Sequence, residues 1–155
     1  MMESHTEKEL FEQLQAEIIE DARKVYSEKV IDRWFNPRNW GRIENPQGIG
    51  RLTGICGDTM ETTLRINDSR ILEAKFSTEG CGPTLAAGSM ATELAVGKSV
   101  QEGFKISQEV ILDNLGGLPQ ESEHCALLAS DTLKEALKDH LAFKQEPWKK
   151  VYQKH

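Results

Sequence analysis

Cysteine is scarce in this chain of 155 residues, which holds only three, and no C-x-x-C pair occurs. An odd number of cysteines argues against a disulfide framework and points to metal binding or thiol chemistry. Without such a pair, the sequence also lacks the usual signatures of zinc ribbons and of thioredoxin-like proteins. Free cysteine often serves as a small buried hydrophobe, but all three here stand beside a glycine or a histidine in turn-like surroundings. We therefore expect these cysteines to carry chemistry.

Long apolar runs and an excess of positive charge are lacking as well. No run approaches the roughly 20 apolar residues that cross a bilayer, so we expect no membrane span. The balance of 19 basic against 25 acidic residues gives a net charge of −6 and argues against nucleic-acid binding. The N-terminus lacks the basic and apolar parts of a signal peptide, so a cytoplasmic location is expected. Phosphate-binding loops of the G-x-x-x-x-G-K-S/T and G-x-G-x-x-G types are missing too.

The chain does have the length and apolar content for one folded domain. Hydrophobic residues make up 38% and charged residues 28%, which is typical of a soluble globular protein with a single core. We divide the chain into an N-terminal helical extension (1–25), a main domain (26–143) and a C-terminal tail (144–155). The tail is expected to be ordered at most in part.

Helical periodicity dominates the first quarter of the chain. Apolar residues recur at helical spacing between residues 6 and 35: Leu10, Leu14, Ile18, Ala22, Val25, Val30, Ile31 and Trp34. The pattern predicts one helix that ends near residue 24 and a second that begins at its cap, Ser27. The segment Asn36-Pro37-Arg38-Asn39 then ends the helix, because the residue before a proline is disfavoured in the α region. The apolar stripe is interpreted as core or as partner-facing surface.

The period changes to that of strands after residue 50. Alternation predicts a strand over 60–66 and another over 71–78, joined by a turn at 67–69. The inner face of the second of these strands is predicted to hold Leu72, Ala74 and Phe76. Residues 49–56 are expected to pair as a third antiparallel strand. Such a meander brings the turn after its first strand and the end of its last strand to one edge of the sheet.

Three helices are predicted after the sheet. The first opens at 82–83 and runs to about 96, with a proline in an early position where its missing N–H costs nothing. A shorter helix covers 107–115, and Ser122 caps a last helix from about 123 to 143. The first and last of these have faces of small or apolar residues: Leu85, Ala86, Ser89, Met90 and Leu94, and Leu128, Leu133, Ala136, Leu137 and Leu141.

Five chemically useful side chains fall in the predicted turns and helix starts. The end of the first strand offers Cys56, and the glycine-containing turn after it carries Asp58. Cys81 lies just ahead of a helix N-terminus, and His124 and Cys125 fall in the first turn of the last helix. The partial positive charge at a helix N-terminus favours a thiolate and lowers the pKa of a thiol below about 8.5. These residues make a candidate metal or sulfur site.

This donor set suits zinc and iron–sulfur clusters, whereas magnesium and calcium want oxygen ligands. The ligands are gathered from three separated loops, so movement of one loop can open the cage and release its contents. A cysteine-nucleophile hydrolase would need one cysteine with a distant histidine, but the plausible histidine here adjoins a cysteine on a helix. The other histidines, His5, His140 and His155, lie near the chain ends or on a helix surface and are interpreted as solvated.

In order and surroundings, the five residues resemble those of the IscU-type iron–sulfur cluster assembly scaffold proteins, which correspond to the N-terminal domain of NifU. The resemblance runs from about Tyr26 to Leu141. It rests on five segments: residues 26–32 (Tyr-Ser-Glu-Lys-Val-Ile-Asp), Asn36-Pro37-Arg38-Asn39 with Gly41, Cys56-Gly57-Asp58, Gly80-Cys81-Gly82, and Leu118-Pro119 leading to His124-Cys125.

The resemblance implies an α+β fold in which helices pack on a three-stranded antiparallel sheet, here with an extra N-terminal helix. It implies a non-enzymatic scaffold that accepts persulfide sulfur from a cysteine desulfurase, binds iron and passes a nascent 2Fe-2S cluster to recipient apo-proteins. Carried over, Cys56, Cys81 and Cys125 are cluster ligands and sulfur acceptors, and Cys125 is the favoured first acceptor. Asp58 and His124 are the ligands that complete or exchange in the site. An iron donor such as a frataxin-like protein and a homodimer are further expected partners.

A mixed ligand shell suits a scaffold, because a hard carboxylate beside three thiolates makes a cluster easier to lose. We therefore hypothesise that Asp58 sets the lability of the cluster. A sister branch, the SufU type, is a zinc-containing sulfur acceptor with an insertion between its second and third cysteines and no histidine before the third. The short span from Cys81 to Cys125 and the presence of His124 favour the scaffold, with the sulfur acceptor as the alternative. Zinc fits the same ligands, since three thiolates with Asp58 or His124 form a tetrahedral set.

Two features depart from the family pattern. The family commonly has a Pro-Val-Lys segment, read by a dedicated Hsp70 chaperone, where this chain has Gln120-Glu121-Ser122-Glu123. We predict that the protein does not use that chaperone in the usual way. The extension before Tyr26 places this tyrosine inside the chain and is expected to pack across the domain or into a dimer. Two other classes stay open: a protein with structural zinc, and an adaptor that binds a desulfurase without building clusters.

Overall fold

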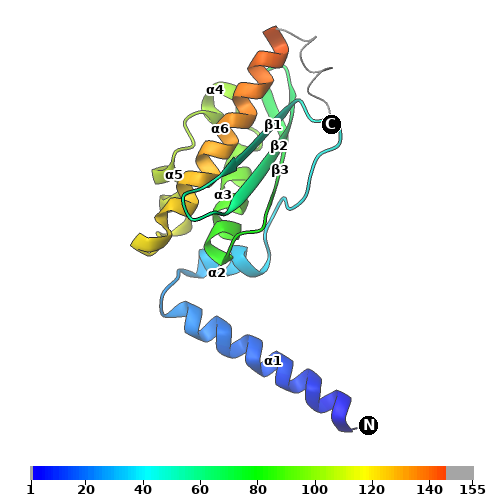
Figure 1. The fold of residues 1–155 in the computed structure, drawn as a ribbon, viewed down its shortest axis with the longest axis vertical. Coiled ribbons are helices and arrows are strands. Elements are labelled where there is room, and N and C mark those ends of the chain that lie inside the picture. The colour runs from blue at the N-terminus through cyan, green and yellow to red at the C-terminus, as the bar shows by residue number, and fades with distance from the viewer. Residues whose placement is uncertain (1, 146–155) are drawn as a thin grey trace.

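The computed structural model describes residues 2–145, with side chains for residues 6–142. Figure 1 shows a sheet covered by helices and one helix that leaves the body of the domain. In chain order the elements are α1 Met2–Arg23, α2 Glu28–Phe35, β1 Gly48–Thr53, β2 Thr59–Asn67, β3 Arg70–Thr78, α3 Gly82–Ala95, α4 Val100–Gly103, α5 Gln108–Leu115, the 3-10 helix η1 Gln120–Ser122, and α6 Glu123–Gln145. The predicted α+β class with an additional N-terminal helix is confirmed. Most of the predicted tail, from residue 146 onward, lies outside the described residues.

The sheet is an antiparallel meander in which β2 lies between β1 and β3. Asp68 and Ser69 join β2 to β3 with φ angles of 52° and 62°, the left-handed values of a two-residue I′ turn. On β2 the predicted inward positions Met60, Leu64 and Ile66 are buried, but the predicted alternation fails at Thr63. This residue is 1% exposed, and its hydroxyl accepts a hydrogen bond from the backbone N–H of Ile43 at 3.0 Å. The hairpin therefore presents one apolar face to the core.

The predicted inner face of β3 is wrong at Leu72, whose side chain is 50% exposed. The strand pairing passes from Arg65 opposite Glu73 to Ile66 opposite Ile71, so Leu72 has no residue opposite it. Such a β-bulge adds one residue to one strand. The side chains on one side of the bulge therefore point to the face opposite to the one that strict alternation predicts. Ile71 is buried in place of Leu72.

Helices α3 and α6 cover the same face of the sheet (Figure 1). Helix α6 packs mainly on β1, and α3 packs on β3. The small residues of α3 allow a close approach, since a Cβ added at Gly88 would come within 2.4 Å of the Phe76 ring. The largest fully buried apolar side chains come from β2, β3, α2, α5 and α6: Phe76, Met60, Leu64, Ile71, Ile111, Leu115, Leu133, Leu137 and Val30.

The segment between α2 and β1 holds the free edge of β3 through the Asn-Pro-Arg-Asn motif. The backbone N–H of Phe76 donates to the carbonyl of Asn39 at 2.9 Å. The backbone N–H of Arg38 donates to Ser89 Oγ at 2.9 Å, and the Asn39 side-chain amide donates to Thr92 Oγ1 at 3.2 Å. The motif thus ties the sheet edge to α3 and covers backbone groups that an edge strand would otherwise expose. Its role here is structural.

The predicted break in the first helical stretch is confirmed. Helix α1 ends at Arg23, and the Ser27 hydroxyl caps α2 by accepting from the backbone N–H of Val30 at 3.2 Å. Only the C-terminal end of α1 is held against the domain, where Ala22 is 7% exposed. The expectation that the extension packs across the domain is wrong, because its apolar side chains further from this end, Leu14 among them, are exposed.

His140 was expected to be solvated but is buried, with a relative exposure of 9%. Its Nδ1 lies 3.3 Å from the carbonyl oxygen of Gln47, just ahead of β1. The contact joins the end of α6 to a segment far away in the sequence, which a single-helix pattern does not reveal. The His155 side chain and that of His5 lie outside the described residues. Within the described part of the chain, none of the helices combines the length and apolarity that crossing a bilayer requires.

Candidate metal and sulfur site

The candidate residues lie at one end of the sheet, where four segments meet. The meander pairs Thr53 with Thr59 and Met60 with Thr78. The β1–β2 turn and the end of β3 are therefore neighbours, and the start of α3 follows directly. The start of α6 reaches the same place, since the Thr84 hydroxyl of α3 lies 3.3 Å from the Sγ of Cys125.

Cys56 lies on an exposed turn and not at a strand end, because β1 ends at Thr53, earlier than predicted. Two backbone hydrogen bonds close this turn: Gly57 N–H to Gly54 O at 3.0 Å and Gly54 N–H to Asp58 O at 2.8 Å. Gly57 has a φ of 91°, which a residue with a side chain rarely adopts. Asp58 is half-buried and accepts a hydrogen bond from the Thr84 hydroxyl at 3.0 Å. The turn therefore exposes its thiol and directs its carboxylate toward α3.

Cys81 is the N-cap residue of α3, with Pro83 in the first turn as predicted. Its side chain is exposed, and its Sγ lies 3.5 Å from Thr84 Oγ1. The Trp34 ring of α2 packs over the next residue, so closely that a Cβ added at Gly82 would come within 1.9 Å of the ring. Glycine at this position allows α2 to buttress the start of α3 and so to hold Cys81 in place.

Thr84 is a residue of this site that the sequence analysis missed. Its hydroxyl lies between three of the predicted ligands, at 3.0 Å from Asp58 Oδ2, 3.3 Å from Cys125 Sγ and 3.5 Å from Cys81 Sγ. Because a hydroxyl has one hydrogen, it can donate to one of these groups at a time while accepting from a thiol. Thr84 is fully buried. Its position three residues after Cys81, on the same helix face, was the signal available in the sequence.

Cys125 is 2% exposed, in contrast to the other two cysteines. Burial raises the pKa of its thiol to about 11, and the neighbouring Cys81 and Cys56 add to the rise, while the hydrogen bond from Thr84 opposes it. The prediction that the helix N-terminus favours a thiolate at Cys125 is therefore wrong for this conformation, because desolvation outweighs the helix dipole. His124 is half-buried, and its Nε2 lies 3.8 Å from Cys125 Sγ.

The five residues are near one another but do not form a closed cage. Among the side chains that the structure describes, no three of the His, Cys, Asp or Glu type converge closely enough to hold a metal ion as they stand. The Thr84 hydroxyl stands between the predicted ligands, and Cys56 lies on the exposed turn. The chemistry of the donor set fits zinc or an iron–sulfur cluster.

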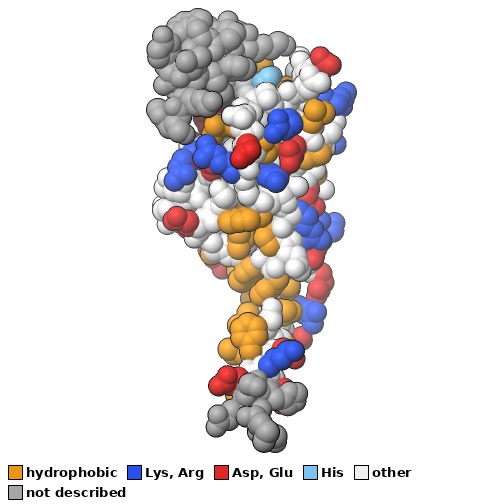
Figure 2. All heavy atoms as spheres, turned by 90° about the vertical axis from the view of Figure 1, so that its right-hand side faces the viewer, with side chains coloured by type: hydrophobic (Ala, Val, Ile, Leu, Met, Phe, Trp, Pro, Cys, Tyr) orange, Lys and Arg blue, Asp and Glu red, His pale blue; other side chains and the backbone are white. Residues whose placement is uncertain are grey.

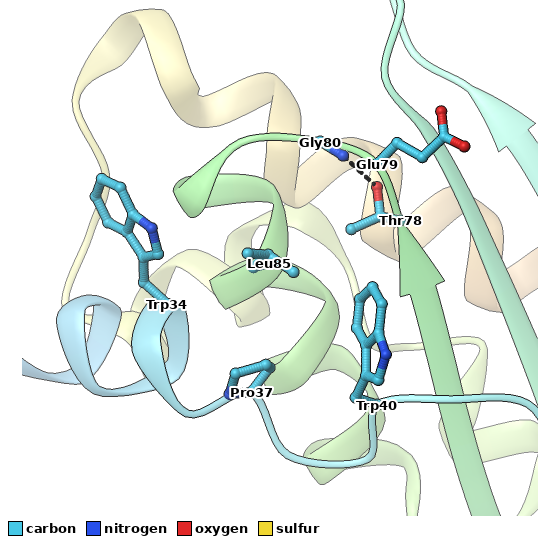
Figure 3. A pocket seen from close by; sticks show the side chains of 7 residues that line it. All are labelled: Trp34, Pro37, Trp40, Thr78, Glu79, Gly80 and Leu85. Atoms are coloured by element: carbon cyan, nitrogen blue, oxygen red, sulfur yellow. Dashed lines mark hydrogen bonds between the residues drawn. The ribbon is translucent and has the colours of Figure 1, made fainter.

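An apolar groove of 430 Å³ opens beside this site (Figure 3). Trp34 and Trp40 stand at its two ends with Leu85 between them, and Gly80, the neighbour of Cys81, belongs to its rim. The groove was not predicted, because it joins Trp34 of α2 and Trp40 of the following segment to Leu85 of α3 and the end of β3, which are distant in the sequence.

Fold and site together define a class: a small α+β domain that presents three cysteines, an aspartate and a histidine from one turn and two helix starts at one end of an antiparallel sheet. The sequence model of the family described as NifU-like N terminal domain matches residues 25–147. The chain belongs to this family. Helix α1 ends at Arg23 and lies entirely ahead of the matched region.

Named relatives agree with this assignment. The "Iron-sulfur cluster assembly scaffold protein IscU 1" of Archaeoglobus fulgidus is 44% identical over 117 residues, which cover 75% of this chain and 76% of the relative. The protein named IscU of Escherichia coli K12 is 42% identical over 121 residues, with 75% and 94% covered.

Solved structures share the fold. A nitrogen-fixing NifU-like protein (N-terminal) from Brucella abortus superposes with a TM-score of 0.62 at 15% identity, covering 76% of this chain and 95% of that one. A putative scaffold protein for the SUF system from Fervidobacterium islandicum gives a TM-score of 0.59 at 23% identity, covering 72% and 96%. At these identities the likeness concerns the fold alone.

Proposed function

We propose that this protein is a scaffold for iron–sulfur cluster assembly. It accepts sulfur from a cysteine desulfurase, binds iron, holds a nascent 2Fe-2S cluster and transfers it to recipient apo-proteins. The observation that carries the proposal is the gathering of Cys56, Asp58, Cys81, His124 and Cys125 at one end of the sheet in a NifU-type domain. The protein is a carrier with sulfur-accepting thiols and not an enzyme. An iron donor such as a frataxin-like protein belongs to the same proposal.

Sulfur enters most readily at the exposed thiols. A thiolate of Cys56 or Cys81 attacks the outer sulfur of the donor's persulfide, the donor's S–S bond breaks, and the donor cysteine leaves as a thiolate. Cys125, which the family resemblance favours as the first acceptor, is buried with a raised pKa. For Cys125 to accept sulfur, the β1–β2 turn has to move away from α6 and admit water or a base. Reducing each transferred sulfur to sulfide then takes two electrons from an external reductant.

Iron is held as cargo by the three thiolates and one harder ligand. Asp58 is suited to exchange, because its carboxylate is bound to the protein by the Thr84 hydroxyl when it is not bound to metal. Breaking that one hydrogen bond releases it for iron, and remaking it helps to release the cluster. His124, beside Cys125, is the other candidate for the remaining position. The same ligands could hold zinc in the protein as purified.

The test is anaerobic reconstitution with Fe²⁺, cysteine and a cysteine desulfurase, followed by visible absorption and Mössbauer spectroscopy. Zinc and sulfide are assayed beforehand on the untreated protein. A 2Fe-2S cluster that forms and passes to an apo-ferredoxin is the expected result. A protein that keeps zinc, takes up persulfide and forms no cluster would instead be a sulfur acceptor of the SufU type.

Replacing Asp58 with alanine is expected to lengthen the lifetime of the bound cluster severalfold, because the exchangeable carboxylate is lost. The measurement is the decay of visible absorption after addition of a chelator or an apo-ferredoxin. Glu79→Ala is the matched control, since it removes one exposed negative charge close to Cys81. Its cluster should decay at the wild-type rate. A lifetime that is unchanged or shorter in the Asp58 variant would refute the role assigned to this carboxylate.

The prediction about the Hsp70 chaperone concerns η1, whose acidic residue Glu121 is exposed. An acidic segment does not fit a partner that reads an apolar and basic one. We expect the protein to stimulate the ATPase of such a chaperone weakly, and the triple change Gln120→Pro, Glu121→Val and Ser122→Lys to raise the stimulation. Normal stimulation by the unchanged protein in the ATPase assay would contradict the prediction.

A further inference from the structure

We propose that Thr84 is a positioning residue whose hydroxyl holds the Asp58 carboxylate while the site is empty and turns to a cysteine sulfur when the site is filled. The inference rests on the proposed function, because Asp58 and the cysteines have to be ligands of the cluster. It adds a residue that is not a ligand itself and that sets how readily the cargo is released.

Thr84 differs from the other buried threonines of the helices in the partners of its hydroxyl. Thr92 of α3 donates to the backbone carbonyl of Gly88 at 3.0 Å, and Thr132 of α6 donates to that of Leu128 at 2.7 Å. A bond to the carbonyl four residues earlier is a common way for a helix to satisfy a buried threonine. In the described part of the chain, the hydrogen-bond partners of the Thr84 hydroxyl are all side chains of the site. This hydroxyl therefore serves the site and not its own helix.

In the empty site the hydroxyl has one hydrogen and three possible acceptors. Asp58 Oδ2 is the nearest at 3.0 Å, followed by the Sγ atoms of Cys125 at 3.3 Å and Cys81 at 3.5 Å. A carboxylate is the strongest acceptor of the three because it is charged, whereas a thiol sulfur accepts weakly. The hydroxyl therefore donates to Asp58, and its oxygen is left to accept from a thiol.

The chain around Cys81 leaves room for this pair of side chains. A Cβ added at Gly80 would come within 2.7 Å of Thr84 Cγ2 and 2.8 Å of Asp58 Oδ2. Glycine at this position therefore allows the carboxylate and the threonine to meet just ahead of α3. Thr84 is fully buried, so bulk water does not compete for its hydroxyl.

Filling the site changes the acceptors that the hydroxyl meets. A coordinated cysteine has lost its proton, so its sulfur can only accept hydrogen bonds. An Asp58 oxygen that binds iron has less charge to offer to the hydroxyl. Cys125 Sγ already lies within reach of Thr84, so the hydrogen can turn to it by rotation about the Cβ–Oγ1 bond alone. Thr84 thus stabilises the empty site through Asp58 and the filled site through a sulfur.

The bond to Asp58 is the stronger of these two bonds. Hydrogen bonds to a charged carboxylate contribute more than those to neutral groups, and a coordinated sulfur has given part of its charge to the metal. The hydroxyl therefore favours the empty site overall, because it competes with iron for the carboxylate. Removing it should make the protein hold its cargo longer.

The first test compares Thr84→Val, which replaces the hydroxyl with a methyl group of similar size, with Thr84→Ser, which keeps the hydroxyl. Each protein is reconstituted with Fe²⁺ and inorganic sulfide, and the decay of visible absorption is followed after addition of a chelator. Thr84→Val is expected to hold its cluster at least about fivefold longer than the unchanged protein, whereas Thr84→Ser should stay within about twofold. Urea unfolding midpoints verify that both variants are folded. Decay of Thr84→Val at the wild-type rate would overturn the proposal.

The same change is then made in an Asp58→Ala background. If Thr84 acts through Asp58, adding Thr84→Val to Asp58→Ala should alter the cluster lifetime by less than about twofold. A fivefold effect that persists without the carboxylate would show a purely structural role and refute the positioning role. Figure 2 shows hydrophobic side chains along α1, a helix that neither substitution changes. Any association of the chain through α1 is therefore common to all the variants.

The reduction potential of the cluster tests the turn toward sulfur. A hydrogen bond to a ligand sulfur withdraws negative charge and so raises the potential. Thr84→Val is therefore expected to have a lower potential than the unchanged protein and Thr84→Ser, and to lower it in the Asp58→Ala background as well. Equal potentials would contradict the second half of the proposal, because the hydroxyl would then not bind a sulfur in the filled site.

Failure of this inference can be distinguished from failure of the scaffold function. If the unchanged protein forms no cluster, the scaffold function is wrong and the role of Thr84 falls with it. If the unchanged protein forms a cluster and Thr84→Val matches it in lifetime and potential, the scaffold function stands and only the role of Thr84 is refuted.

Discussion

Replacing Cys56 with serine is expected to abolish stable cluster binding while leaving the folded state as stable as before. Cys56 lies on the exposed β1–β2 turn, and substitutions at such positions usually change the free energy of unfolding by less than about 0.5 kcal/mol. A serine hydroxyl is a poor ligand for iron in a sulfide-bridged cluster, since thiolates are the soft donors that such clusters select. The amount of bound cluster should therefore fall at least about tenfold.

The measurement is the iron and sulfide content after reconstitution with Fe²⁺ and inorganic sulfide. No desulfurase is present, so the result does not depend on binding to one. A urea unfolding curve verifies that the fold is intact. Ile55→Ser is the matched control, because this neighbour on the same turn is 92% exposed and offers no ligand. It should bind as much cluster as the unchanged protein. Wild-type cluster content in the Cys56 variant would remove this cysteine from the proposed ligands.

Much of the fold could be predicted because it rests on local rules that the sequence displays directly. Ser27 and Ser107 cap helices through hydrogen bonds to the backbone three residues later, and Pro83 begins α3 where its missing N–H is harmless. Gly116 ends α5 with a φ of 79°. Each of these signals involves only residues that are close together in the sequence, so it can be recognised without knowing any distant contact.

The errors in the fold arise from contacts between distant segments. Leu72 was placed on the inner face of β3 because the period of a single strand does not reveal a bulge, which depends on the pairing with β2. His140 was interpreted as solvated, although Gln47 and the start of β1 cover it. The stripe on α1 had the spacing of a core-facing helix, but spacing alone cannot tell whether the domain or another molecule covers the stripe.

The candidate site could likewise be predicted only in part from the sequence. Rare residue types in turns identified the five residues that the structure brings to one end of the sheet, because cysteine beside glycine is conspicuous in any sequence. Thr84 was missed because a threonine in a helix is ordinary, and only its distances to Asp58 and the thiols single it out. The pKa of Cys125 was expected to fall at a helix N-terminus but is raised, since burial is set by tertiary packing that the helix start does not encode.

Replacing Gly50 with alanine is expected to destabilise the protein strongly, by about 3 kcal/mol, because it overpacks the contact between β1 and α6. A Cβ at Gly50 would come within 2.3 Å of the Thr132 carbonyl oxygen and 2.6 Å of the Ala136 nitrogen. Both are backbone atoms of a helix, so relief requires α6 to move as a whole. That movement would also shift Cys125 at the start of the same helix away from Thr84. The variant should therefore lose both stability and most of its ability to hold a cluster.

The change in stability is measured as the shift in the urea unfolding midpoint at constant slope. Gly54→Ala is the matched control just after β1, because the nearest atoms to its Cβ would be side-chain atoms of Leu128, the first at 3.4 Å, an ordinary contact. Its stability should stay within about 1 kcal/mol of the unchanged protein, since alanine at a compatible position also reduces the entropy of the unfolded chain. If Gly50→Ala unfolds at the same urea concentration as Gly54→Ala, β1 and α6 do not pack backbone to backbone. The position of Cys125 would then not depend on that contact.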